Sequence, residues 1–548
     1  MSRLTDLLLA TARTSETGMV TGEPHTPRRR TWAEVHTRAR SVAATLTSSG
    51  LRPGAAVAVL AVEPDLVAAS VQGAWLVGAS VTVLHQPTPR TNLSTWVQDT
   101  LAALELVRAD VVLLGATFGA AALALEDCGV TSLRLTDLVT GTASDLLLPA
   151  AAKESSTALL QLTSGTTAAP KAVRITHGTL LNSVLALSRR LRLTPGEDVL
   201  ESWLPLFHHL GLAGSLVLPM VLGLELVEVT PADFLATPLL WPRLLHDYGG
   251  TVTSAPDCAF ALLAEHLAEV PDSSGFDLSR LRIALNSGEP VDEHTTENLI
   301  AAGTRFGLNP DSVQAAYSLT EASLVVSASP ARGVTVDLVD PEQLEYANAA
   351  TTSDPDALEA RRLTRLGPPL PGLEVRAVGT DGTTLAAREV GELEVRGPVV
   401  AAGYLDHNGT TSALDDDGWL RTGDIGYLAE GDVVVCGRAN DVITVGGRRL
   451  YPTGIEQAVG AICGVRAGNA VAVRHLNAAN RESLAVVVES AHVTDHALTA
   501  RLSREIAAQV ARMTGVRPIA VRVLSPGSLP KTSSCKLRRG LARYLAEH

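Results

Sequence analysis

The sequence predicts an α/β fold with a large N-terminal part and a smaller C-terminal part. Near the start, Ala55 to Ala61 and Ser80 to His85 have the apolar character of strands, and Asp65 to Val77 between them is typical of a helix. This alternation indicates a parallel sheet with helices on both faces. The chain of 548 residues also exceeds what one hydrophobic core usually supports, so we expect at least two domains.

Other segments extend this pattern along the chain. Thr31 and Glu34 have the spacing of a capping box before a helical repeat that ends at Gly50. Further strands are expected at Val111 to Leu114, Leu281 to Leu285, Gly391 to Arg396 and Val433 to Gly437. Toward the C-terminus, a small α+β unit is indicated by strands at Ala470 to Val473, Leu484 to Glu489 and Ile519 to Leu524, with a helix from about His496 to Met513.

Charge and composition exclude several classes of function. The net charge of -13, from 45 basic and 58 acidic residues, argues against a non-specific binder of nucleic acid or of anionic membranes. We expect no secretory signal, because the N-terminal stretch MSRLTDLLLATARTSE has too short an apolar run. We also expect no integral membrane segment, because the longest apolar region, Ser215 to Val229, is interrupted by Pro219 and Glu225. The distant cysteines suggest inert buried thiols in a reducing, cytoplasmic enzyme: Cys128, Cys258, Cys436, Cys463 and Cys535.

A hydroxyl-rich loop is the strongest local signal. Thr157 to Leu162 predicts a buried strand, and after it come Thr163, Ser164, Gly165, Thr166 and Thr167, with Lys171 at the exit of the loop. Such donors suit a polyphosphate, although an ordinary Ser/Thr turn is the alternative, and the spacing is not that of a Walker A loop. A helix is expected to begin at Thr176, with its N-terminus adding positive charge near the phosphates.

This loop resembles the phosphate loop of the adenylate-forming superfamily, which contains acyl-CoA synthetases, acyl-AMP ligases and peptide-synthetase adenylation domains. Six further stretches resemble that superfamily in the right order: SWLPLFHHLGLAG from Ser202, NSGEPV from Asn286, AYSLTE from Ala316, GWLRTGDIGYL from Gly418, GRANDVITVGGRRLYP from Gly437 and LPKTSSCKLRR from Leu529. The resemblance implies the adenylate-forming enzyme fold. In that fold, residues 1–440 would form stacked α/β sheets with a β-rich subdomain, and residues 441–548 a mobile α+β domain that moves about a hinge at Asp441.

The resemblance also implies a site for ATP, Mg²⁺ and a carboxylic acid. Tyr317 would stack on adenine, Asp424 would accept hydrogen bonds from the ribose, Thr320 would contact phosphate, Glu321 would hold the metal, His208 would orient the acid, and Lys536 would catalyse adenylation. The remaining nucleotide contacts would come from Thr163 to Thr167, Lys171, Ser287, Gly288, Glu289, Pro290 and Arg438. A hard cation is needed because a carboxylate that attacks the α-phosphate brings two anions together.

The chain departs from the family pattern at several motif positions. Ala168, Ala172, Ser318 and Cys535 stand where the family has glycine, and His209 stands where the acyl-AMP ligases have aspartate. A side chain at Ser318 would crowd the nucleotide or the acyl group.

Several segments, among them LHQPTPRTNLSTWVQDTL and GGRRLYPTGIE, resemble the fatty-acyl-AMP ligases that load an acyl carrier protein. Within that branch the resemblance is to actinobacterial ligases of isonitrile lipopeptide assembly. It implies ATP-dependent formation of a fatty acyl-AMP and transfer of the acyl group to the phosphopantetheine thiol of the carrier protein. A fatty acyl-CoA ligase, an enzyme that activates another anion such as nitrite, and a degenerate nucleotide-binding protein remain as alternatives.

Overall fold

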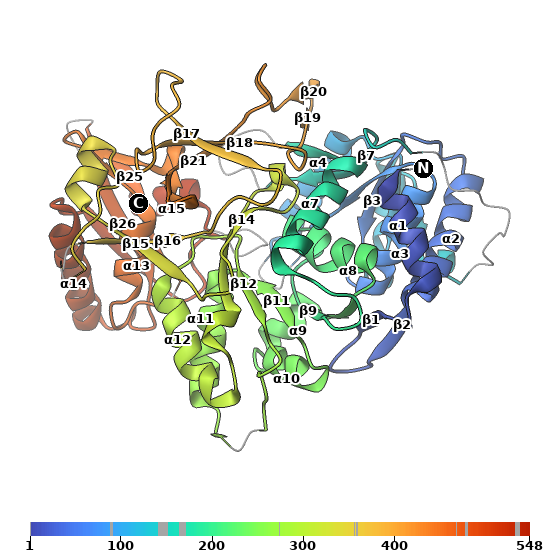
Figure 1. Cartoon of the computed structure of the whole chain (residues 1–548), viewed down its shortest axis with the longest axis horizontal. Coiled ribbons are helices and arrows are strands. Elements are labelled where there is room, and N and C mark those ends of the chain that lie inside the picture. The colour runs from blue at the N-terminus through green and yellow to red at the C-terminus, as the bar shows by residue number, and fades with distance from the viewer. Residues whose placement is uncertain are drawn as a thin grey trace.

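The computed structural model describes residues 2–87, 91–140, 152–163, 171–272, 275–355, 357, 360–466, 468–476, 481–531 and 537–547. These residues form two eight-stranded sheets, a six-stranded sheet and, toward the C-terminus, a two-stranded and a three-stranded sheet. In Figure 1 the N-terminal elements (blue) and the C-terminal elements (red) lie at opposite ends of the long axis. The predicted α/β fold is confirmed.

The first eight-stranded sheet contains the strands predicted near the start of the chain. Its order is β20-β19-β8-β7-β4-β3-β5-β6. The strands are β3 (Ala56–Leu60), β4 (Ser80–Val83), β5 (Val111–Leu114), β6 (Ser132–Arg134), β7 (Thr157–Leu162), β8 (Ala172–Thr176), β19 (Gly403–Asp406) and β20 (Gly409–Ser412). β3 to β7 are parallel as predicted, whereas β8, β19 and β20 add an antiparallel edge.

The second eight-stranded sheet has the order β14-β13-β12-β11-β9-β10-β1-β2. Its strands are β1 (Gly18–Thr21), β2 (Arg28–Thr31), β9 (Val199–Ser202), β10 (Glu225–Glu228), β11 (Val252–Ala255), β12 (Ile283–Asn286), β13 (Val313–Ser318) and β14 (Val325–Ala328). All neighbours are parallel except β2 and β14, which are the antiparallel edges. The carboxyl ends of β11, β12 and β13 therefore meet along one side of this sheet.

Helices fill the space between these sheets and cover their outer faces. The almost completely buried α3 (Pro64–Leu76) contacts β1 of one sheet and β3 and β4 of the other. The capping box of α2 is present as predicted, with Thr31 and Glu34 bonding each other's backbone N–H groups. The other helices of this part are α1 (Arg3–Thr14), α2 (Trp32–Ser48), α4 (Leu93–Val107), α5 (Ala121–Asp127), α6 (Leu135–Leu138), α7 (His177–Leu191), α8 (Leu218–Leu222), α9 (Pro231–Ala236), α10 (Leu240–Asp247), α11 (Asp257–Glu269) and α12 (Glu293–Gly303).

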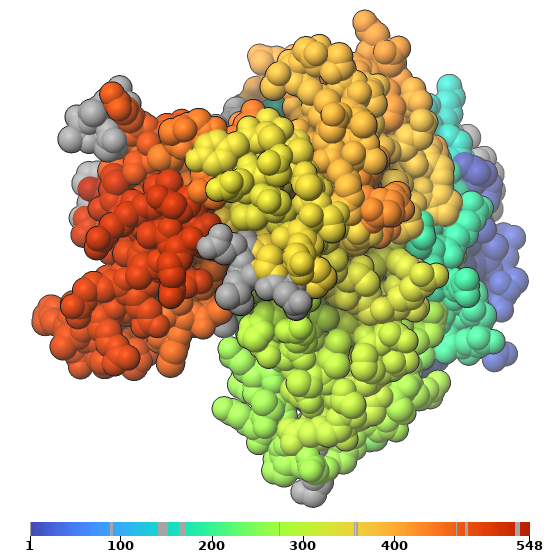
Figure 2. Space-filling model, turned by 60° about the vertical axis from the view of Figure 1, so that its left-hand side comes forward, coloured from blue at the N-terminus to red at the C-terminus, as the bar shows by residue number. Residues whose placement is uncertain are grey.

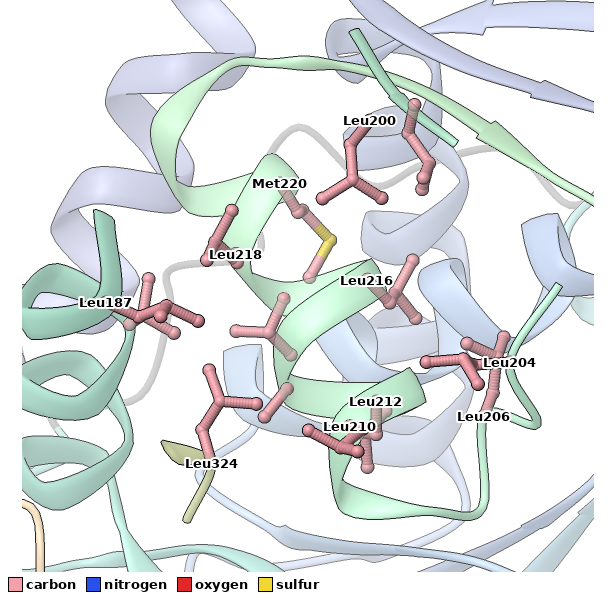
Figure 3. Packing of buried hydrophobic residues seen from close by; sticks show 14 of the residues in the cluster. Leu187, Leu200, Leu204, Leu206, Leu210, Leu212, Leu216, Leu218, Met220 and Leu324 are labelled. Atoms are coloured by element: carbon pink, nitrogen blue, oxygen red, sulfur yellow. The ribbon is translucent and has the colours of Figure 1, made fainter. Parts of the chain in front are cut away.

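An apolar core supports the turn that carries His208 and His209. The π-helical segment Leu210–Val217 follows this turn, and Figure 3 shows its Leu212 and Leu216 among leucines from separate elements, including Leu187 and Leu324. Gly211 is required here, because a Cβ atom at this position would lie 2.3 Å from the carbonyl oxygen of Pro205. The close approach of the backbone to itself fixes the direction of the histidine turn.

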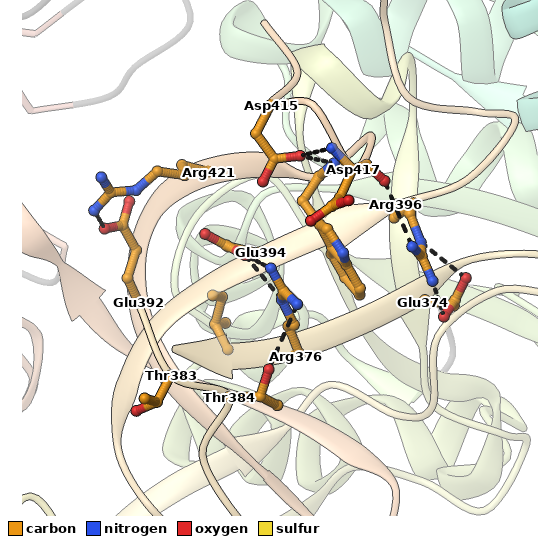
Figure 4. Close-up of polar contacts among 12 residues, drawn as sticks. Glu374, Arg376, Thr383, Thr384, Glu392, Glu394, Arg396, Asp415, Asp417 and Arg421 are labelled. Carbon is orange, nitrogen blue, oxygen red and sulfur yellow. Dashed lines mark hydrogen bonds and ion pairs between the residues drawn. The ribbon is translucent and has the colours of Figure 1, made fainter. Parts of the chain in front are cut away.

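The six-stranded sheet is antiparallel and has the order β15-β16-β22-β21-β18-β17. Its strands are β15 (Thr335–Val339), β16 (Arg361–Arg365), β17 (Glu374–Val378), β18 (Gly391–Arg396), β21 (Leu420–Ala429) and β22 (Asp432–Arg438). On β17 and β18, Arg376 pairs with Glu394 at 2.7 Å and Arg396 with Glu374 at 2.8 Å (Figure 4). The two guanidinium carbons lie 4.0 and 4.5 Å from the ring centroid of Trp419, so cation–π contacts fasten the start of β21 to its neighbours.

The C-terminal residues contain the predicted strands and helix. The elements are β23 (Ile443–Val445), β24 (Arg448–Leu450), α13 (Pro452–Gly460), β25 (Ala470–Leu476), β26 (Glu482–Glu489), α14 (His496–Thr514), β27 (Ala520–Leu524) and α15 (Arg539–Glu547). Ile455, Leu484 and Ile506 belong to an apolar cluster whose members all follow residue 442.

One buried carboxylate joins these C-terminal elements to the preceding part of the chain. Glu345, which is 2% exposed, accepts a hydrogen bond of 2.7 Å from Arg361 on β16 and another from Arg448 on β24. The same two arginines donate to backbone oxygens at the end of α14, Arg361 to Met513 at 2.8 Å and Arg448 to Thr514 at 2.5 Å. Glu345 therefore accepts hydrogen bonds from two arginines, one that precedes residue 441 in the sequence and one that follows it.

The prediction of buried thiols is wrong for two cysteines. Cys436 is buried and Cys258 is half-buried, but Cys128 and Cys463 are exposed, because Cys128 is the residue directly after α5 and Cys463 lies in the turn beyond the end of α13. Cys535 lies outside the described residues. Within the ranges that the structure describes, no helix is both long and apolar enough to cross a membrane.

Candidate active site

A cleft of about 2000 Å³ brings most of the predicted site residues together. Its wall includes the histidine turn, the segment from Gly288 that follows β12, the end of β13, the six-stranded sheet at Asp424 and Arg438, and residues of the C-terminal elements. In Figure 2 the red C-terminal residues gather on one side of the molecule, and the surface is hollowed between them and the green segment that contains α11 and α12.

The two ends of the predicted phosphate loop are held together. The Thr163 N–H donates to the carbonyl oxygen of Lys171 at 3.0 Å, and the Thr163 hydroxyl donates to the same oxygen at 3.2 Å. Predicted contacts Ser164, Gly165, Thr166 and Thr167 lie outside the described residues, as does the substitution Ala168. Lys536 and Cys535 also lie outside them.

The expectation that a helix N-terminus adds charge near the phosphates is wrong. The helix does begin after Thr176, which caps it, but strand β8 lies between the loop and α7. β8 runs antiparallel to β7, so that Ala172 pairs with Leu162 while Thr176 pairs with Thr157. The helix therefore starts at the opposite end of this hairpin, about 15 Å from the loop at the usual rise per strand residue.

A buried carboxylate lies between two of the predicted nucleotide contacts. Asp424 is 4% exposed, accepts a hydrogen bond from the Tyr317 hydroxyl and forms an ion pair with Arg438, whose Nε lies 2.9 Å from Oδ1 of Asp424. The register of β21 and β22 places Asp424 directly opposite Arg438. Burial and the Asp424 charge raise the pKa of Tyr317, so the phenol keeps its proton and donates. Three residues predicted from separate motifs thus form one group, joined by a hydrogen bond and an ion pair.

The histidine turn meets the segment that follows β13. His209 is 4% exposed, and its Nδ1 lies 3.2 Å from the Thr320 hydroxyl. The His208 ring is 4.3 Å from the His209 ring and lines the cleft. Gln161 on β7 donates to the carbonyl oxygen of Phe207 at 2.7 Å, which ties the turn to the strand before the phosphate loop. The departure at His209 therefore places an imidazole against a predicted phosphate contact.

Glu321 is held by a tyrosine that the sequence analysis did not single out. The Tyr404 hydroxyl donates to Glu321 Oε1 at 3.0 Å, and Lys171 Nζ lies 5.1 Å from the centroid of the Tyr404 ring. Burial and the Glu321 charge raise the pKa of Tyr404, so this phenol also stays protonated. Because Mg²⁺ is commonly held by one or two carboxylates together with phosphate oxygens, a single oriented carboxylate at Glu321 beside Thr320 fits that ion.

Gly288, Glu289 and Pro290 line the cleft, and Ser287 directly before them is buried. The Ser287 hydroxyl donates to the Ala316 carbonyl at 3.0 Å, and Glu289 Oε1 accepts from the Cys258 N–H at 2.5 Å. Gly288 has a φ of +97°, a backbone conformation that favours glycine. The turn is therefore pinned both to β13 and to the first turn of α11.

Asp257 is a second residue that the sequence analysis missed. It lines the cleft and accepts hydrogen bonds from Asn286 Nδ2 at 2.7 Å, from the Asp292 N–H at 3.0 Å and from the Thr295 hydroxyl at 2.9 Å. Burial raises the pKa of this carboxyl to about 7. An acidic residue in the first turn of a helix was the available signal, but that pattern is also typical of ordinary capping.

Two other predicted positions lie on the cleft wall. The Ser318 hydroxyl is buried and has no hydrogen-bond partner among the described residues. Asp441 pairs with Arg539 Nε at 3.1 Å, and Arg539 also pairs with Glu456. The proposed hinge residue therefore contacts α15, the helix that begins soon after Lys536.

A family model described as AMP-binding enzyme matches residues 10–405, and the chain belongs to this family. A protein named "Putative ligase Rv1013" from Mycobacterium tuberculosis is 46% identical over 541 residues, which cover 98% of each chain. The long-chain-fatty-acid–AMP ligase FadD32 of Mycolicibacterium smegmatis is 30% identical over 447 residues, covering 73% of this chain and 70% of that protein.

A solved structure described as "Structural and Functional Studies of Fatty Acyl-Adenylate Ligases from E. coli and L. pneumophila" matches with a TM-score of 0.90. It covers 100% of this chain and 98% of that chain at 26% identity. The prediction of an adenylate-forming enzyme fold is therefore confirmed.

Proposed function

We propose that this enzyme activates a fatty acid with ATP, forming a fatty acyl-AMP, and then passes the acyl group to the phosphopantetheine thiol of an acyl carrier protein. The observation that carries the proposal is the group formed by Tyr317, Asp424 and Arg438 on the wall of the cleft that also holds Thr320 and Glu321. The similarity to a fatty-acid–AMP ligase and to a structure of the fatty acyl-adenylate ligases supports a fatty acid as the substrate.

In the first step the acid carboxylate attacks the α-phosphorus of ATP, and pyrophosphate leaves. Tyr317 and Asp424 bind adenine and ribose, while His208 orients the carboxylate and Thr320 contacts phosphate. Lys171, Lys536 and the loop from Thr163 to Thr167 stabilise the charge that develops on the phosphates. A magnesium ion held by Glu321 supplies charge neutralisation when it is bound.

In the second step a thiol attacks the acyl carbonyl carbon and AMP leaves. We place this step after a rotation of residues 441–548 relative to residues 1–440 about Asp441, because the two reactions need different groups at one cleft. The carrier protein as acceptor and a place in lipopeptide assembly rest on the stretches that resemble the carrier-protein-loading ligases. The cytoplasm as location rests on the scattered cysteines and the lack of an expected signal or membrane segment in the sequence.

The experiment is a pyrophosphate-release assay with magnesium-ATP across saturated and unsaturated fatty acids. Wild type should release pyrophosphate only when an acid is present, and Lys536→Ala should abolish this release while transfer from supplied acyl-AMP survives. Loss of both reactions would overturn the assignment of Lys536.

Mass detection of acyl transfer to coenzyme A and to a phosphopantetheinylated carrier protein identifies the acceptor. Transfer to the carrier protein alone is expected, whereas transfer to coenzyme A would make the enzyme a fatty acyl-CoA ligase. If no acid supports release of pyrophosphate, the proposed substrate class is wrong.

A further inference from the structure

Tyr404 contacts two residues of the proposed site from outside the motifs that define it. It lies on β19, which pairs antiparallel with β8 so that Tyr404 stands opposite Val173. Lys171 is two residues before Val173, at the exit of the phosphate loop, and its Nζ lies 5.1 Å from the centroid of the Tyr404 ring. An aromatic face attracts an ammonium group without consuming its hydrogen-bond donors, so the Lys171 donors stay available to oxygen ligands.

The hydroxyl of the same tyrosine reaches the other eight-stranded sheet. It donates to Glu321 Oε1 at 3.0 Å, and Glu321 lies in the short turn that follows β13. The Ala401 N–H donates to the carbonyl oxygen of Glu321 at 2.7 Å, which fixes the two backbones beside each other. The half-buried Tyr404 therefore contacts two charged groups: its ring contacts the Lys171 ammonium, and its hydroxyl contacts the Glu321 carboxylate.

We propose that Tyr404 is a positioning residue for magnesium-ATP. Its hydroxyl fixes the orientation of the Glu321 carboxylate, which would hold the ion, and its ring holds Lys171, which would contact the phosphates. A hydrogen bond on Oε1 leaves Oε2 available as a ligand, and Mg²⁺ demands near-ideal geometry, so a freely rotating carboxylate would bind it less well. This inference rests on the proposed function, because that function requires magnesium-ATP to bind in the same cleft.

Two substitutions separate the two contacts. Tyr404→Phe keeps the ring beside Lys171 and removes only the hydroxyl, so the magnesium-dependent gain in nucleotide affinity should fall about tenfold, the size expected for a hydrogen bond to a charged group. Tyr404→Leu also removes the ring and should weaken nucleotide binding without magnesium as well. Tyr248→Phe is the matched control, because the Tyr248 hydroxyl donates to Glu23 at 2.6 Å and neither residue lines the cleft.

The measurement is calorimetric titration of the full chain with a non-hydrolysable ATP analogue, in magnesium and in EDTA, with no acid present. We expect Tyr404→Phe to match wild type in EDTA and to bind more weakly in magnesium, and Tyr248→Phe to match wild type in both. An equal magnesium-dependent gain in Tyr404→Phe and wild type would overturn the role of Tyr404 and leave the proposed function standing. Failure of wild type to bind the analogue would overturn the proposed function itself.

Discussion

The stability of the chain should fall as pH rises, because two glutamates are enclosed in the second eight-stranded sheet. Glu201 on β9 is 0% exposed and Glu228 on β10 is 1% exposed. Burial raises the pKa of each carboxyl well above its ordinary value, and the charge on Glu201 raises that of Glu228 further. The folded chain therefore binds more protons than the unfolded chain once pH exceeds the ordinary carboxyl pKa of about 4.3.

The sign and size of the effect follow from this difference in bound protons. Stability is fully present below the unfolded pKa and is lost as pH rises toward the folded pKa, by about 1.4 kcal/mol per pH unit for each carboxyl. Glu228→Gln carries no charge and has nearly the shape of the protonated acid. The variant should match wild type near pH 5 and exceed it in stability at pH 8, by at most about 4 kcal/mol over these three pH units.

The free energy of unfolding of wild type and of Glu228→Gln is measured by urea or thermal unfolding at several pH values between 5 and 8. The difference between the two proteins should grow by about 1.4 kcal/mol per pH unit. Glu269→Gln is the control, because it makes the same change of side chain at an exposed position of α11. A constant difference between wild type and Glu228→Gln would refute the reasoning.

Two further substitutions test the cleft and the contact with the C-terminal residues. Asp424→Asn should raise the KM for ATP at least about tenfold, because Arg438 and Tyr317 lose a charged acceptor; an unchanged KM in pyrophosphate release would remove Asp424 from the nucleotide site. Arg448→Met should speed proteolytic cleavage near Asp441, because a charged hydrogen bond to Glu345 worth about 2 kcal/mol is lost. Cleavage no faster than in Arg504→Met, a change at an exposed arginine of α14, would contradict that expectation.

Segments with a clear local signal were predicted from the sequence. The capping residues Thr31 and Glu34 and the apolar strands β3, β5 and β7 need only their own residues to be recognised. The cleft residues Tyr317 and Asp424 were found because each lies in a stretch that resembles a known family. Their hydrogen bond, by contrast, joins positions 107 residues apart and follows from the packing of two sheets.

The misses have the same physical origin. β8 is five residues long and is stabilised by its pairing with β7 and β19. The apolar pattern of this segment was therefore too short to show whether a strand or the start of a helix follows the phosphate loop. Tyr404 follows Glu321 by 83 residues and belongs to a different sheet, so no spacing in the sequence indicates their contact. Such pairs are set by the assembly of the sheets.

The double pairing of Glu345 has a kinetic consequence for the proposed rotation. If the C-terminal residues move and take Arg448 with them, Arg361 stays on the same side of Asp441 as Glu345 and keeps the buried carboxylate neutralised. Loss of the Arg448 hydrogen bond then costs about 2 kcal/mol, which alone slows opening about thirtyfold. The hydrogen bond from Arg361 to the Met513 carbonyl oxygen also breaks and adds to this cost. Stranding the carboxylate alone would cost about 5 kcal/mol and slow opening several thousandfold. The second arginine therefore removes the penalty of an unpaired buried carboxylate from the cost of the proposed rotation.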